Sequence, residues 1–205
     1  MLEKRKFPQI ILQEEFKLLV NFNRDLLDEQ EKFHLDLFLL CFYTGGIALK
    51  DFAYLKWEDI NEGDQLDCRK FKYPLVNSIS LTEEAINIID KYKITSYSDY
   101  VLPIFTHVHK SSAIKGKRIK QLAYRINLTL RKIYDILNLK KGYPTWKTAK
   151  YSFIAKLFME KKHPREIYSF TGLTAASIDL YLYTLGCSSE KELHLKQCEH
   201  LNRIL

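Results

Sequence analysis

The sequence lacks the features that mark metal-binding, secreted and membrane proteins. Its four cysteines include no Cys-x-x-Cys pair. His107 and His109 would need two more ligands at suitable spacing to hold zinc, and none is evident, so we expect no metal and no cofactor. No apolar run approaches the roughly 18 residues of a membrane-spanning helix. The first residues also lack the apolar stretch of a signal peptide. We therefore expect a cytoplasmic protein that does not enter a membrane.

Acidic side chains are almost missing from residues 110–165. This window carries 16 of the 32 lysines and arginines but only Asp135 and Glu160, a net charge of +14. The rest of the chain, with 16 cations and 23 acids, has a net charge of −7. Such an asymmetry is typical of a surface that binds a polyanion. Clustered cations bind duplex DNA by releasing its counterions, so we expect duplex DNA as the partner.

A basic helix surface can be merely solvated, but two successive basic helices favour a binding face. We predict that the DNA contacts come from these helices and the segment just before them. The candidate cations are Lys110, Lys115, Lys117, Arg118, Lys120, Arg125, Lys147 and Lys150.

Hydrophobic periodicity predicts a mainly α-helical domain with one small antiparallel β-sheet, an α+β fold. Residues 32–43 are apolar on nearly every side, so we expect a central buried helix that ends at Thr44-Gly45-Gly46. Residues 66–71 and 76–81 predict a strand hairpin. Other helical segments are expected at 12–22, 47–55, 82–92 with Thr82 as N-cap, 117–137, 145–161, 174–185 and 189–205. Without a repeat or a long linker, residues 1–205 are expected to form a single domain.

One stretch resembles a known family. Residues 42–60 read Phe-Tyr-Thr-Gly-Gly-Ile-Ala-Leu-Lys-Asp-Phe-Ala-Tyr-Leu-Lys-Trp-Glu-Asp-Ile. They resemble the segment of the tyrosine recombinases, the phage-integrase family, in which a buried helix ends in a Thr-Gly turn and a short acidic helix leads to a first strand. The later order is similar too, with a hairpin containing Lys72, the Tyr-Val-Leu-Pro-Ile-Phe segment at 100–105, and two basic helices.

The resemblance covers about residues 8–187 and implies the fold of the family's catalytic domain. In the family, a small helical domain that closes around DNA usually precedes this one. The sequence contains no such domain, so a fragment or an abbreviated relative is expected. The resemblance also implies that the terminal segment, 189–205, docks on a second copy of this chain or on a related recombinase. The alternative is that the segment packs on its own domain.

In the family, a tyrosine hydroxyl attacks a DNA phosphate and forms a 3′-phosphotyrosine. Two arginines hold the non-bridging oxygens, and a hairpin lysine, here matched by Lys72, protonates the leaving oxygen. The first arginine position falls on Gly45 or Ala48. The second belongs to a His-x-x-Arg motif, whose two positions hold Lys147 and Lys150.

The nucleophile position is ambiguous in this sequence. The family commonly places it ten residues after a glycine that Gly172 matches, and this spacing reaches Leu182. Tyr181 and Tyr183 flank that position and are the candidate nucleophiles. Losing one preorganised hydrogen-bond donor to the transition state typically lowers the rate by about 10²–10³. The replacement of the family's arginines and histidine therefore predicts impaired catalysis, while the remaining lysines predict retained DNA affinity.

Three functional hypotheses follow. The first is a degenerate tyrosine-recombinase-like pseudoenzyme that binds DNA, with integration or recombination of a mobile element as its context. The second is an active recombinase that uses Tyr181 or Tyr183 with Lys50, Lys147 and Lys150 as substitute cations. The third is a protein-interaction module without a DNA role.

Overall fold

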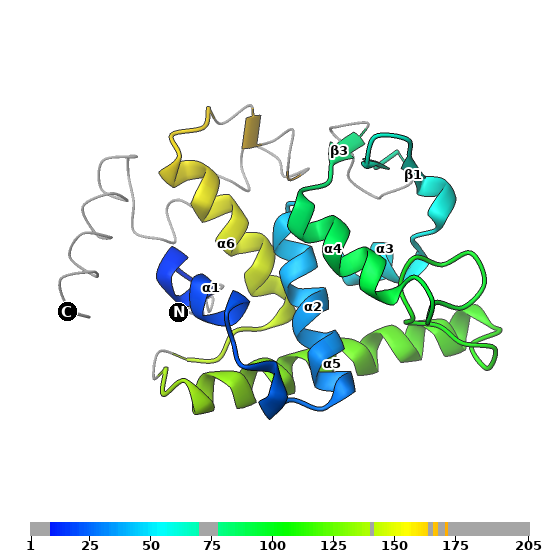
Figure 1. Ribbon diagram of the computed structural model, residues 1–205, viewed down its shortest axis with the longest axis horizontal. Helices are drawn as coiled ribbons and strands as arrows, with labels where there is room; N and C mark the ends of the chain where they lie inside the picture. Colours follow the sequence, from blue (N-terminus) through cyan, green and yellow to red (C-terminus); the bar gives the residue numbers. More distant parts are fainter. Residues whose placement is uncertain (1–8, 70–77, 140–141, 164–165, 168–170, 172–205) are drawn as a thin grey trace, which may run out of the picture.

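The computed structural model describes residues 9–69, 78–139, 142–163, 166–167 and 171 (Figure 1). The six described helices are α1 (Gln13–Val20), α2 (Glu29–Tyr43), α3 (Leu49–Tyr54), α4 (Glu83–Tyr92), α5 (Ser112–Ile136) and α6 (Trp146–Met159). Two short 3-10 turns, η1 (Arg24–Leu26) and η2 (Trp57–Asp59), complete the helical elements. Lys72, Tyr181, Tyr183 and the segments predicted at 174–185 and 189–205 lie outside the described residues.

Helix α2 is the centre of the core, as its apolar sequence predicts. All ten residues from Phe33 to Phe42 are buried, and α4, α5 and α6 pack around them. The helix begins at Glu29 instead of residue 32 because a capping box precedes the apolar run. The Asp28 carboxylate accepts a hydrogen bond from the backbone N–H of Glu31, and the Glu31 carboxylate accepts one from the backbone N–H of Asp28.

The small sheet is antiparallel and has the order β1-β2-β3. Its strands are β1 (Ile60–Asn61), β2 (Gln65–Asp67) and β3 (Ser78–Ser80). The predicted strands at 66–71 and 76–81 correspond to β2 and β3, although β2 already ends at Asp67. Strand β1 lies where the family resemblance places a first strand, at the end of the stretch 42–60, although its two residues are too short to show a period-two pattern.

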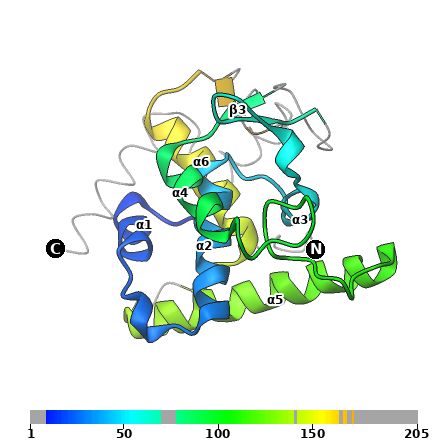
Figure 2. The same ribbon diagram turned by 45° about the vertical axis from the view of Figure 1, so that its right-hand side comes forward.

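Helix α5 is 25 residues long and crosses the base of the molecule under the other helices (Figures 1 and 2). Its predicted apolar face is confirmed, since Leu122, Ile126, Leu130 and Ile133 are buried. The helix starts five residues earlier than predicted, because the Ser111 hydroxyl caps it by accepting from the N–H of Ile114.

No described helix has the length and apolar character needed to cross a membrane.

Candidate nucleic-acid interface

The glycine turn after α2 lies directly against α6. Gly45 and Gly46 have φ angles of +75° and +87°, a region that favours glycine. A Cβ atom on Gly46 would lie 2.4 Å from Cγ and 2.8 Å from Cα of Lys150. The turn that the resemblance assigns to the first arginine position therefore touches Lys150, which the resemblance assigns to the second.

Lys150 is half-buried. Its Nζ donates a hydrogen bond of 2.9 Å to the carbonyl oxygen of Thr171. Burial lowers the pKa of Lys150, and the charge of Asp51 opposes that shift. Burial raises the pKa of Asp51 itself, while the charges of Lys50 and Lys150 counteract the rise. An ammonium has three donors, and the Thr171 carbonyl uses one of them.

Among the described residues, no carboxylate lies within ion-pair distance of Lys150. A partly desolvated cation of this kind is stabilised by any anion that reaches it. Lys150 can therefore hold a phosphate oxygen, but its ammonium cannot grip two oxygens in the fixed fork geometry of a guanidinium.

Lys147 stands one turn earlier on α6 and is exposed. The start of α6 is fixed on α5, because the Trp146 N–H donates a 2.8 Å hydrogen bond to the Asn127 side-chain oxygen. The Trp146 ring also makes an edge contact with Phe52 of α3. These contacts bring Lys147 next to the middle of α5.

Three predicted cations of α5, Lys117, Lys120 and Arg125, are exposed. None of them forms an ion pair with a described residue. At about 100° per residue, they lie away from the buried face of the helix. We call this surface, together with Lys147, the basic face. Lys110, just before α5, is exposed as well.

The other two predicted cations of α5 make contacts inside the protein. Lys115 Nζ lies 2.8 Å from the Tyr100 hydroxyl and 5.1–5.5 Å from the ring centroids of Tyr54, Tyr100 and Phe105. Arg118 donates from Nε to the carbonyl oxygen of Ile104, and burial lowers the pKa of its guanidinium. Both side chains attach the 100–105 segment to the first turns of α5.

Neither residue expected at the family's first arginine position, Gly45 or Ala48, carries a guanidinium group. Ala48 is the exposed N-cap of α3, and Gly45 is buried in the turn. Lys50 is exposed on α3. The acidic residue of the short helix, Asp51, lies near enough to Lys150 to perturb its pKa, a relation that no local sequence signal indicates.

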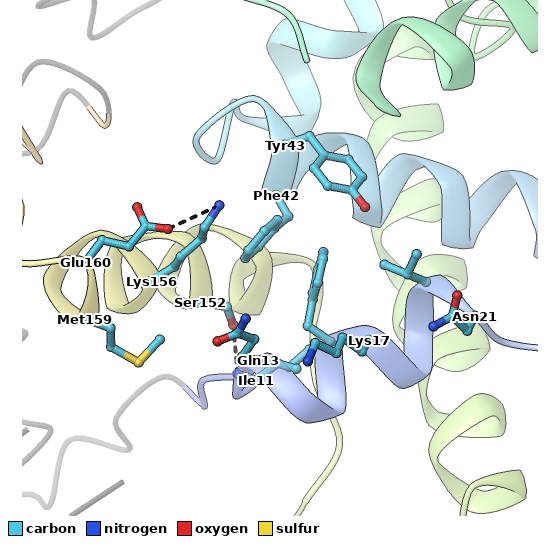
Figure 3. A pocket seen from close by; sticks show the side chains of 12 residues that line it. Ile11, Gln13, Lys17, Asn21, Phe42, Tyr43, Ser152, Lys156, Met159 and Glu160 are labelled. Atoms are coloured by element: carbon cyan, nitrogen blue, oxygen red, sulfur yellow. Dashed lines mark hydrogen bonds and ion pairs between the residues drawn. The ribbon is translucent and has the colours of Figure 1, made fainter. Parts of the chain in front are cut away.

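A separate groove of about 390 Å³ lies between α1, the end of α2, and α6 (Figure 3). The rings of Phe16 and Phe42 stack in it with centroids 3.8 Å apart, and Tyr43 adjoins them. Lys17 and Lys156 also line it. This groove contains none of the predicted site residues, and the described part of the chain holds no cluster of His, Cys, Asp or Glu suited to a metal.

Two solved structures resemble this fold. XerA recombinase aligns with a TM-score of 0.62 and 14% identity over 95% of this chain and 66% of that chain. The Tn1549 transposon integrase (residues 82–397), in complex with circular intermediate DNA, aligns with a TM-score of 0.60 and 13% identity over 88% of this chain and 62% of that chain.

No family model and no curated protein matches the sequence. The chain spans somewhat less than two thirds of the length of both structural neighbours. The comparisons confirm the predicted fold: mainly α, with a small antiparallel sheet, similar to the catalytic domains of tyrosine recombinases.

Proposed function

We propose that this protein is a DNA-binding, tyrosine-recombinase-like protein of DNA integration or recombination whose strand cleavage is impaired. The observation that carries the proposal is the half-buried Lys150 ammonium, which has no carboxylate partner among the described residues and lies beside the basic face. The recombinase-like fold supports it, as does the presence of DNA in the structure of the Tn1549 integrase.

The proposed phosphate site consists of Lys147 and Lys150. Lys147 offers an exposed charge, and Lys150, next to the packed turn, has ammonium donors that no described residue other than Thr171 occupies. Point charges suffice to hold a phosphate in the ground state, whereas bidentate stabilisation of a transition state needs guanidinium groups. Gly45 and Ala48 provide no such group, so binding is retained and cleavage is slow.

Duplex binding as a function of salt tests the DNA role. We expect the affinity to fall steeply with ionic strength and to be strongly reduced by Lys147→Glu combined with Lys150→Glu. Because Lys150 packs on Gly46, Lys147→Glu combined with Lys150→Met serves as a milder variant that keeps the stem. Lys162→Glu, an exposed lysine just beyond α6, is the control. Unchanged binding by a folded double variant would overturn the proposal.

A nicked suicide DNA substrate tests the impaired chemistry. We expect no covalent protein–DNA adduct on the timescale of an active recombinase. An adduct that Tyr181→Phe or Tyr183→Phe abolishes would instead establish the active-recombinase alternative. DNA binding without an adduct supports both parts of the proposal.

We further propose self-association, because the aromatic side chains in the groove of Figure 3 could bind an apolar helix face. Residues 189–205 carry a stripe of Leu193, Cys198, Leu201, Ile204 and Leu205 at helical spacing, and we propose that this stripe occupies the groove of a second copy. Size-exclusion chromatography with light scattering should show a dimer or larger species that Leu201→Asp disrupts. A monomer at all concentrations would refute it.

A further inference from the structure

Asp51 is a half-buried carboxylate next to the proposed phosphate site. It lies in the first turn of α3, and its side chain forms no hydrogen bond or ion pair with any described residue. A partly desolvated carboxylate is ordinarily compensated by a direct partner, because removing a charge from water is costly. The charge of Asp51 is balanced only by cations at longer range.

The packing of α3 against α6 places Asp51 near Lys150. The ring of Phe52, the next residue, makes an edge contact with Trp146 at a centroid distance of 6.2 Å. Trp146 lies one turn before Lys150 on α6, so the two share one face of that helix. The turn that leads into α3 touches Lys150 through Gly46. Asp51 therefore interacts with the Lys150 ammonium through its charge, although the two groups form no ion pair.

The charged neighbours of Asp51 come from two helices. Lys50, on α3 itself, and Lys150, on α6, counteract the rise in the pKa of Asp51 that burial causes. From α2, the Cys41 thiol also lies near Lys150, and burial raises the pKa of this thiol, so it stays neutral. From α5, Lys115 reaches α3 at the Tyr54 ring, three residues further along.

A DNA phosphate held by Lys150 would bring a second anion into this neighbourhood. Two anions that share one site raise the pKa of the weaker acid. A phosphodiester stays ionised, so the carboxylate of Asp51 is the group that takes up a proton. Without DNA, the same carboxylate has a different effect, since its charge helps to keep Lys150 protonated against burial.

We propose that Asp51 makes DNA binding pH-dependent: its ionised carboxylate weakens phosphate binding, and it takes up a proton from solvent when DNA binds. This inference rests on the proposed DNA-binding function and adds a regulation to the same site. The pKa of Asp51 is then higher in the complex than in the free protein. The affinity therefore rises as the pH falls through the pKa of the complex, and it levels off below the pKa of the free protein.

Duplex affinity between pH 5 and pH 7.5 tests the inference in the full chain. Asp51→Asn keeps the shape of the side chain and removes its charge. At pH 7.5 we expect this variant to bind roughly 3- to 30-fold more tightly, the effect of removing one like charge several ångströms from the phosphate. Toward pH 5 the affinities of the two proteins should converge. Asp90→Asn, at an exposed position on α4, makes the same change in net charge and is the matched control, which should bind as the wild-type chain does.

Calorimetric titration in two buffers of different ionisation enthalpy measures the proton uptake directly. The wild-type chain should take up a fraction of a proton on binding DNA, and this fraction should increase as the pH falls. Exposed histidines such as His107 titrate equally in both proteins, so the difference between wild type and Asp51→Asn isolates the carboxylate. An absence of proton uptake by the wild-type chain would overturn the inference without recourse to any variant.

The outcomes separate this inference from the proposed function. If a folded Asp51→Asn variant binds DNA less tightly than the wild-type chain, the carboxylate supports the site instead of opposing phosphate, and the inference is refuted. Parallel pH profiles of the two proteins would refute it as well, while DNA binding itself stands. If no duplex binds at any pH, the proposed function fails and the inference fails with it.

Discussion

Gly46 and Lys150 are packed so closely that only a hydrogen atom fits on the Gly46 Cα in the direction of α6. A Cβ there would lie 2.4 Å from Cγ and 2.5 Å from Cβ of Lys150, and 2.8 Å from its Cα. The contact joins the turn after α2 to the first turns of α6 and so determines where the Lys150 ammonium emerges. The geometry of the proposed phosphate site therefore depends on a glycine.

We expect Gly46→Ala to lower the free energy of unfolding by about 2–4 kcal/mol, because a positive φ is strained for alanine and the new methyl group overpacks the backbone of α6. Two glycines serve as controls. Gly63 has a φ of +99° but no atom within 4 Å of an added Cβ, so Gly63→Ala isolates the backbone strain. Gly116 lies in α5 and is also uncrowded, so Gly116→Ala should raise the free energy of unfolding by about 0.5–1 kcal/mol. Denaturant unfolding measures all three, and equal losses for Gly46→Ala and Gly63→Ala would contradict the steric contact.

The cations of α5 should separate into two classes in DNA binding. Lys117→Ala and Lys120→Ala should each reduce the slope of log affinity against log salt by about 0.9, since each removes one phosphate contact. Lys115→Met should leave the slope unchanged, because that ammonium is held by three aromatic rings and Tyr100. The measurement is a salt titration of duplex affinity for each variant. A slope that falls equally for Lys115→Met would show that this lysine contacts phosphate.

This division marks the limit of what could be predicted from the sequence. The apolar period of α5 correctly predicts its buried face, because periodicity is a local property. The inward contacts of Lys115 and Arg118 depend on Tyr54, Tyr100 and Ile104, whose positions are set by tertiary packing. A count of charges treats all these cations alike and cannot separate those that face solvent from those that do not.

The candidate site shows the same limit. The Thr44-Gly45-Gly46 turn and Lys150 can each be matched to the family's motifs by order along the chain. Their direct contact joins Gly46 and Lys150, which are 104 positions apart, and only the packing of α6 against the end of α2 reveals it. The hydrogen bond from Lys150 to Thr171 is likewise nonlocal.

A buried carboxylate ties α4 to the centre of the fold. Asp36 is 1% exposed and accepts from Arg24 Nη1 at 2.5 Å and from Lys91 Nζ and the Tyr92 hydroxyl at 2.6 Å each. Burial, followed by the hydrogen bond to Asp36, raises the pKa of Tyr92. The carboxylate is thus fully compensated by three donors from η1 and α4.

We expect Asp36→Asn to lower the free energy of unfolding by about 2–3 kcal/mol. This is less than the 3–5 kcal/mol typical of a broken buried pair, because Arg24 and Lys91 are partly exposed and can regain water. Glu14→Gln, which breaks the exposed pair with Lys17, should cost no more than about 1 kcal/mol. Thermal or denaturant unfolding of the two variants measures both losses. Equally small losses for Asp36→Asn and Glu14→Gln would show that the Asp36 network contributes little to the free energy of unfolding.

His34 is a second buried polar group, at the packing contact between α2 and α5. Its Nδ1 lies 2.9 Å from the Thr129 hydroxyl oxygen. Burial, reinforced by the charge of Arg118, lowers the pKa of His34 from 6.5 to about 4. The native protein therefore holds this imidazole neutral over a pH range in which the unfolded chain protonates it.

Between about pH 6.5 and pH 4, the unfolded state binds more protons than the native state at this site. The free energy of unfolding should therefore fall as the pH drops through that window, by up to about 3 kcal/mol, and should be insensitive to His34 above it. His34→Gln retains a partner for Thr129 but cannot titrate. Subtracting its pH profile, measured by denaturant unfolding, from that of the wild-type chain removes the contribution of the carboxylates. The difference should slope only within this window, and two parallel profiles from pH 4 to 7 would show that protonated His34 is tolerated between α2 and α5.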